Sequence, residues 1–344
     1  MLGNVTRNQH FLTQGEQRLN ALNPKADSSN LRIYSFTVVD RENYTLALES
    51  PNGRPIGSNL SLFDLFSFDV PGNSRLRLNF ESLLQKYEGY IEAHTKSLLA
   101  KLNARSGDIE AEIIDLFAKL LNFVRNPFCI AKVLNSFPGV ARFDPTDPAL
   151  LADYRRIVTG RKPHQTHLCT QLGISDAQYV EWLRLLFMLL MPMAANRPNF
   201  FEEMIKNLLE NRKMHVAAFV CEYDDHRCLL SDRGFSQPIA DGPHMAFSFN
   251  LCATAFVHYI FADPATLVQG KASPEFIAQA IANWERLPTK QINVTFLRNN
   301  LGMLVRYNRR VVEQCYRRVY CSVKDGLVLS ESRFDAAAAV TLPP

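Results

Sequence analysis

The hydrophobic periodicity of this 344-residue chain changes twice along its length, and these changes restrict the folds that it can adopt. Residues 31–49 are rich in β-branched and aromatic side chains around a polar turn, which predicts a β-hairpin. Residues 80–124 instead repeat apolar side chains at helical spacing, and residues 215–261 return to strand-like runs. We therefore expect an α+β fold, in which a predominantly helical block is inserted between the N-terminal hairpin and a later antiparallel sheet, with a helical C-terminus.

The boundaries of these parts follow from turn and capping residues. The helical block is predicted over residues 74–213, with a break at Pro127, which lacks a backbone donor. Its helices are expected near residues 80–102, 108–124, 149–158, 175–192 and 200–212, and residues 160–173 are expected to form a polar connection.

The strand-rich part is predicted over residues 214–262. A hairpin is expected to turn at Asp224-Asp225-His226, with further strands over residues 244–249 and 255–261 that could join the early hairpin. A helix should open at Ser273, before Pro274, and another should carry the late arginines. We predict a single globular domain over residues 1–325 and a loose tail over residues 326–344.

The composition is that of a folded protein of mildly basic character. Apolar residues make up 47% and charged residues 21%, which excludes a disordered chain, and the net charge of +4 permits nucleic-acid contact without requiring it. No apolar run reaches the roughly 18 residues of a membrane-spanning helix. Seven cysteines, an odd number without repeated spacing, are typical of reduced thiols, so we expect a cytoplasmic protein without membrane contact.

Polar side chains that could take part in catalysis or specific hydrogen bonding cluster in the first twenty residues: Gln9, His10, Glu16 and Arg18. An imidazole titrates near working pH and can act as a base or ligand, with a carboxylate to orient it. The alternative is that Gln9 and His10 only tie the N-terminus to the core by hydrogen bonds.

Two further groups could hold a metal ion. Glu88 and Glu92 lie four residues apart on one helical face, close to His94, and could bind Mg²⁺ or Mn²⁺. A solvated face shared with lysines explains the same residues. Zinc is disfavoured, because the histidines and cysteines near residues 164–169 and 221–228 do not form two tight ligand pairs.

Arginines and tyrosines alternate near the end of the chain. The arginines could bind the phosphates of a nucleic acid while the tyrosines stack on its bases. The arginines of this predicted nucleic-acid surface are Arg306, Arg309, Arg310, Arg317 and Arg318. Arg306, Arg310, Glu313 and Arg317 would share one helical face, so an ion-paired solvated surface is the competing account.

Several short segments occur in the order of a known bacterial family. They are Gln9-His10, Glu88, Arg125-Asn126-Pro127, Leu230-Ser231-Asp232 and the ending from Gln314 to Cys321. In this order the chain resembles a bacterial family of unknown function whose members open with a Gln-His signature. Thr13 follows where members often carry a proline, and Pro238 lies farther from Asp232 than the proline of members does. The resemblance implies a bacterial or mobile-element protein and implies no established reaction.

Common catalytic motifs are absent from the sequence: it contains no phosphate loop, GxGxxG, GxSxG or HExxH. Our leading hypothesis is a bacterial effector that acts on nucleic acid as a metal-assisted nuclease in a phage-defence or toxin setting, a setting taken from the genomes in which such families occur. His10 would be base or ligand, Glu88 a metal ligand and Arg125 a phosphate clamp. The alternative is a non-enzymatic sensor or scaffold that binds a protein or small ligand between the helical block and the late sheet.

Overall fold

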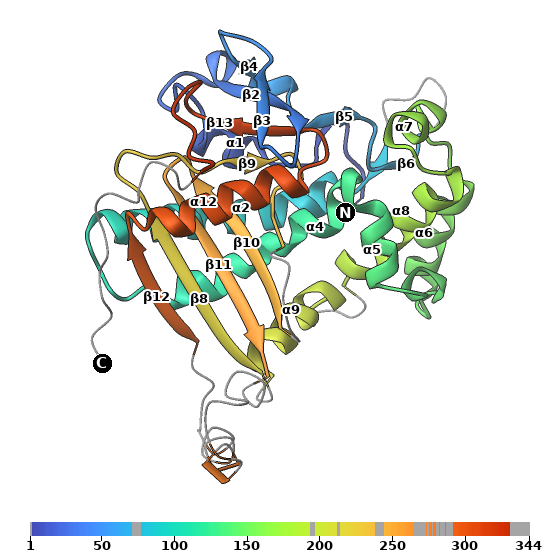
Figure 1. The fold of residues 1–344 in the computed structure, drawn as a ribbon. Coiled ribbons are helices and arrows are strands. Elements are labelled where there is room, and N and C mark those ends of the chain that lie inside the picture. The colour runs from blue at the N-terminus through green and yellow to red at the C-terminus, as the bar shows by residue number, and fades with distance from the viewer. Residues whose placement is uncertain are drawn as a thin grey trace.

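Two larger β-sheets, two small β-ribbons and the helices between and beside them make up the described part of the fold, so the α+β expectation is confirmed (Figure 1). The computed structural model describes residues 2–70, 77–192, 197–211, 214–237, 244–263 and 292–330, together with isolated positions between 273 and 286. The predicted helix that opens at Ser273 falls largely outside these residues.

The helical block follows its hydrophobic periodicity. It contains α2 (Glu81–Asn103), α3 (Glu110–Leu116), α4 (Leu121–Arg125), α5 (Ile130–Ser136), α6 (Pro148–Thr159), α7 (Gln165–Leu172), α8 (Asp176–Leu190) and α9 (Phe200–Glu210). The expected break at Pro127 is present, and Ser175 with Gln178 forms the capping box that begins α8. A short helix, α1 (Gln14–Leu19), precedes the block.

One expectation within the block is wrong: residues 165–172 form α7 and are not an open connection. The helix buries only Leu168, Cys169 and Leu172, and its remaining side chains are polar and mostly exposed. Because only three residues of α7 are buried, the sequence shows little apolar periodicity there, and the helix was not predicted.

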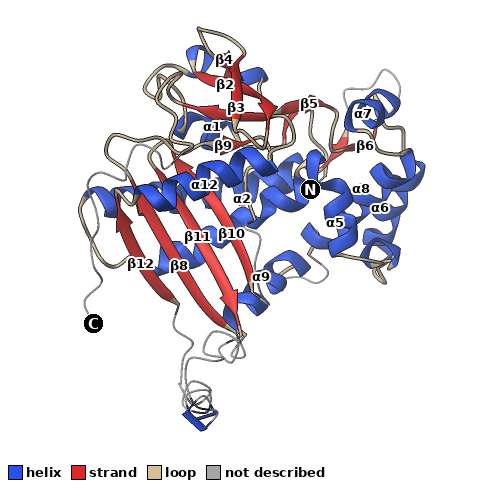
Figure 2. Ribbon diagram, viewed as in Figure 1, coloured by secondary structure: helices blue, strands red, loops and turns tan. Residues whose placement is uncertain are grey.

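A four-stranded sheet forms the late β part (Figure 2). Its order is β10 (Met245–Cys252), β11 (Ala255–Ala262), β8 (His215–Glu222) and β12 (Asn293–Arg298). The first three strands are antiparallel neighbours, whereas β12 pairs in parallel with β8 at the edge. The hairpin expected at residues 224–226 is wrong, because the amides of Tyr223 and Cys228 donate to carbonyls of the β10–β11 turn, at Thr254 and Ala253.

The early hairpin belongs to a separate sheet. β2 (Arg32–Asp40) and β3 (Thr45–Leu48) pair as predicted, and the order continues through β13 (Arg318–Cys321) to β9 (Leu230–Ser231), with β4 (Arg54–Pro55) on β2. Of the late strands, β9 thus reaches the hairpin sheet through β13, while β8, β10 and β11 do not. Two small ribbons, β1 (Asn8–His10) with β5 (Ser61–Phe63) and β6 (Ser67–Asp69) with β7 (Leu78–Asn79), complete the N-terminal part.

The last helix is shorter than predicted. α12 (Leu301–Gln314) carries Arg306, Arg309 and Arg310, but Arg317 lies after it and Arg318 lies in β13. The Asp232 carboxylate accepts hydrogen bonds from the backbone amides of Tyr316, Arg317 and Arg318 at 2.7–2.9 Å, and these bonds replace the continuation of the helix.

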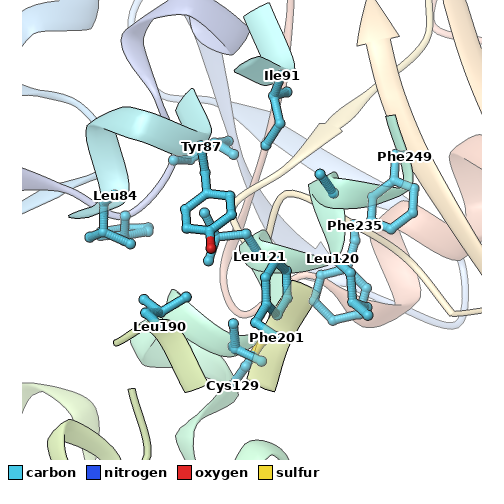
Figure 3. Packing of buried hydrophobic residues seen from close by; sticks show 14 of the residues in the cluster. Leu84, Tyr87, Ile91, Leu120, Leu121, Cys129, Leu190, Phe201, Phe235 and Phe249 are labelled. Atoms are coloured by element: carbon cyan, nitrogen blue, oxygen red, sulfur yellow. The ribbon is translucent and has the colours of Figure 1, made fainter. Parts of the chain in front are cut away.

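The core lies on both faces of the four-stranded sheet. α2 and α3 cover the face of Val216, Ala218 and Val220, and Phe117, between α3 and α4, contacts four aromatic rings of β10 and β11. Figure 3 shows the neighbouring part of this core, where Tyr87 and Phe201 meet. α12 covers the opposite face and reaches the hairpin sheet, with Tyr307 stacked on Phe256 at 4.0 Å between ring centres (Figure 1).

The segment after β13 packs on α12. Leu327, Val328 and Leu329 contact the α12 core, and Asn308 and Arg309 donate side-chain hydrogen bonds to the carbonyls of Val328 and Leu329. Residues 331–344 lie outside the described part of the chain. No helix in the described ranges has the length and hydropathy that crossing a bilayer requires.

Replacing Asp232 by alanine should destabilise the fold strongly. Three backbone amides would lose a charged acceptor, so we expect the free energy of unfolding in urea to fall by about 2–4 kcal/mol. Asp27→Ala, at an exposed aspartate without a side-chain cap bond, should stay within about 0.5 kcal/mol of the parent. Equal losses in the two variants would contradict the role given to Asp232.

Candidate functional site

A chain of charged and amide side chains, buried except for the partly exposed Glu88, joins α1, α2, the 3₁₀ turn Phe117–Leu120 and α4. The Arg125 guanidinium, which is fully buried, donates to Glu88 at 2.6 Å and to the amide oxygen of Asn122 at 3.3 Å. The Asn122 amide nitrogen donates in turn to both carboxylate oxygens of Glu16 at 3.2 Å, and the Lys119 ammonium pairs with the same carboxylate. We call these five residues the buried network.

Helical spacing places three members of this network on one face. Lys119, Asn122 and Arg125 follow one another at steps of three through the 3₁₀ turn and α4, so their side chains point the same way. The next residue, Asn126, donates to the backbone carbonyl of Asp232 at 3.0 Å. The network is thereby connected to β9 and, through the Asp232 carboxylate, to β13.

Most of the polar residues singled out in the sequence are held by partners within the protein. Gln9 is fully buried; its amide donates to Thr6 and Ser67 and accepts from the backbone of Phe66. Ser231 accepts from the backbone of Arg233, and exposed Arg18 bonds to Ser28. For Gln9 these contacts agree with a side chain that ties the N-terminus to the core by hydrogen bonds, and Ser231 and Asp232 lie in the interior.

His10 differs from these residues. Its Nε2 atom is buried and has no hydrogen-bond partner among the described residues. Burial lowers the pKa of His10, and nearby Arg125 acts in the same direction, against the backbone of Ile56 and the charge of Glu88. The ring is therefore mainly neutral at pH 7, with a nitrogen that is not used by the fold.

Glu81 is a member of this site that the sequence did not indicate. Burial raises the pKa of Glu81 to about 7; the charge of Glu88 acts in the same direction and that of Arg125 opposes it. Glu81 begins α2, two turns before Glu88 and on the same face. That spacing was the available signal. His10 and Glu81 thus both feel the charges of the Glu88–Arg125 ion pair; His10 is mainly neutral at pH 7 and Glu81 titrates near neutrality.

The expected metal ligands do not converge. Glu92 pairs with Lys96 at 2.6 Å on the exposed side of α2, whereas Glu88 pairs with Arg125. Within the described ranges, no group of three histidine, cysteine or acidic side chains is arranged to hold a metal ion. Glu88 and Glu92 are thus each engaged by a basic side chain of the protein.

The arginines of α12 are partly engaged within the protein. Arg309 lies over the ring of Tyr44 and bonds to Leu329, and Arg310 pairs with Glu313 at 2.8 Å. Arg306 is exposed. For Arg309 and Arg310 these contacts agree with the solvated, ion-paired reading.

Arg317 and Arg318 instead line a hollow of about 250 Å³ beside the β1–β5 ribbon. Arg54 and Tyr316 also line it, and Tyr316 is stacked on Phe128 at 4.3 Å. Arg54 and Arg318 share the Glu49 carboxylate, while the Arg317 side chain is exposed. We call this feature the Tyr316 hollow; it combines arginine forks with an aromatic surface.

A larger hollow of about 820 Å³ lies between α2, α3 and α9, beside Ile292. Its base is apolar, and its polar side chains bond mainly to one another: Tyr87 and Lys86 to Glu202, and Tyr90 to Asp115. A hollow of this size and composition is typical of small-molecule sites.

In comparisons with known proteins, no family model, no curated protein and no solved structure matches this chain.

The pKa of Glu81 predicts a pH-dependent stability. Because the pKa of Glu81 is raised above its ordinary value of 4.5, the folded state binds this proton more tightly than the unfolded chain does. The resulting contribution to the free energy of unfolding is present at low pH and is lost as the pH rises through about 7. Glu81→Gln, which stays uncharged, should therefore gain stability relative to the parent between about pH 5 and pH 8. Urea unfolding of both proteins across this range measures the difference; a difference that does not change with pH would contradict the assignment.

Proposed function

We propose that this protein binds single-stranded nucleic acid and hydrolyses its phosphodiester bonds, as a cytoplasmic bacterial effector in a defence or toxin setting. One observation carries the proposal: His10, whose Nε2 has no partner among the described residues, pairs across the β1–β5 ribbon with Ser61, which lines the Tyr316 hollow. A candidate base is therefore one strand away from a basic and aromatic hollow.

The substrate would be held in the Tyr316 hollow. Arg317 and Arg318 would contact phosphates, and the exposed part of Tyr316 would stack on a base. These contacts tolerate any base sequence, so the proposal is for binding without strong sequence preference. The resemblance to the Gln-His family supports the bacterial setting.

The reaction would use proton transfer by the two perturbed groups. Neutral His10 would accept a proton from the attacking water as its oxygen bonds to phosphorus, and protonated Glu81 would donate to the leaving oxygen as its bond to phosphorus breaks. Glu88 and Arg125 would act through their charges on these two groups, which replaces the phosphate-clamp role that we expected for Arg125.

Removing the base should abolish cleavage in a folded protein. We expect His10→Ala to reduce the cleavage rate of labelled RNA or single-stranded DNA by at least about a hundredfold, the usual contribution of a general base. His226→Ala, in the loop after β8, is the matched control and should cleave like the parent. Each protein is assayed with Mg²⁺, Mn²⁺ and chelator, together with duplex DNA as a third substrate.

A thermal melt of each variant separates catalysis from folding. If the His10→Ala variant melts at the temperature of the parent and cleaves at the rate of the parent, His10 is not the catalytic base. Salt-sensitive binding without cleavage by the parent would reduce the proposal to a nucleic-acid-binding module.

The hollow between α2, α3 and α9 favours a second candidate, a sensor that binds a small apolar ligand. It is lined mainly by helices of the helical block, with Ile292 just before β12 on one side. Leu209→Trp, which fills the hollow, should then displace a fluorescent apolar dye that the parent binds. Equal dye binding by both proteins would rule out this candidate.

A further inference from the structure

A second basic hollow lies at the other end of the β1–β5 ribbon. It has a volume of about 360 Å³ and is lined by residues from three separate parts of the chain, including Arg7, Asp64, Arg77, Arg161 and His164. Arg7 immediately precedes β1, Asp64 follows β5, and Arg161 and His164 lie in the loop between α6 and α7. The fold therefore brings these charges together across nearly the whole N-terminal half.

The charges in this hollow do not cancel. Asp64 is buried and its carboxylate pairs with buried Arg77 and accepts from Ser67, so its charge is used within the wall. Arg7 and Arg161 are exposed, and neither side chain has a partner among the described residues. Three arginines face one aspartate, and two positive charges remain without an acidic partner in that part of the chain.

The arginines are held in place by their backbones. The Asp64 amide donates to the Arg7 carbonyl at 2.8 Å, and the Val70 amide donates to the Arg161 carbonyl at 3.1 Å. Gly160 fixes the loop further, because a Cβ atom there would come within 2.2 Å of the Phe68 carbonyl. Substitution of either guanidinium thus removes charge without removing a contact that holds the fold.

We propose that this hollow binds a phosphate dianion, either inorganic phosphate or the terminal group of a phosphate monoester. The two free guanidinium forks match the planar pairs of oxygens that such an anion presents, and the Asp64–Arg77 pair keeps the wall between them rigid. The His164 ring, 3.9 Å from Asp64, closes one side. This site stands on its own residues and does not depend on catalysis at His10.

Titration calorimetry with inorganic phosphate at low ionic strength tests the proposal. We expect saturable binding by the parent and affinities at least about tenfold weaker for Arg7→Gln and Arg161→Gln, because each loses a bidentate charged contact. Arg155→Gln, at an exposed arginine of α6, is the matched control and should bind like the parent. No binding by the parent, or equal weakening in the control, would overturn the site.

Two oligonucleotides of one sequence, with a 5′-phosphate or a 5′-hydroxyl group, identify the source of the anion. Tighter binding of the phosphorylated strand that is lost in Arg161→Gln would assign the hollow to a nucleic-acid end. Equal binding of the two strands, with phenyl phosphate competing against inorganic phosphate, would assign it to a small monoester. Phosphate binding should be unchanged in His10→Ala, so failure at one site does not imply failure at the other.

Discussion

The ion pair between Lys119 and Glu16 is the interaction on which the arrangement of this protein depends. The Lys119 side chain is almost entirely buried and the Glu16 side chain is 8% exposed. Charges removed from water are costly unless they are paired and fully hydrogen-bonded, so the surrounding helices must keep both groups in place. Asn122 donates hydrogen bonds to Glu16 in place of the water that burial removes. Its amide oxygen accepts from Arg125, which pairs with the Glu88 carboxylate, so these side chains are held together.

The network has consequences for both the fold and the candidate chemistry. Asn126 and Asp232 extend it to the C-terminal strand, so segments from the two ends of the chain meet around α4. Burial lowers the pKa of His10 and raises that of Glu81 to about 7, and the charges of Glu88 and Arg125 act on both groups in opposite directions. Structural charges and candidate catalytic groups therefore share one electrostatic environment.

The sequence predicts local features well and distant pairings poorly. The helices α2 and α8 follow from periodicity and capping, because these signals lie within the helices themselves. β12 was missed, since it is a largely exposed edge strand without alternation, and the pairing of β9 with β13 joins residues far apart in the chain. His10, Glu88 and Arg125 were named together, but Glu81 was not; its spacing from Glu88 places it on the same helical face, whereas its raised pKa depends on burial, which the sequence does not show. The internal role of Gln9 and Asp232 likewise follows only from their partners.

A double-mutant cycle on Glu16 and Lys119 tests this account most directly. The variants Glu16→Gln, Lys119→Met and their combination are compared with the parent by urea unfolding. The account predicts that each single change costs about 3–5 kcal/mol, because it leaves an unpaired buried charge. It further predicts that the double change costs less than the sum of the two by at least about 1.5 kcal/mol. The account would be contradicted if each single variant lost less than about 1 kcal/mol of unfolding free energy and the double variant lost the sum of the two.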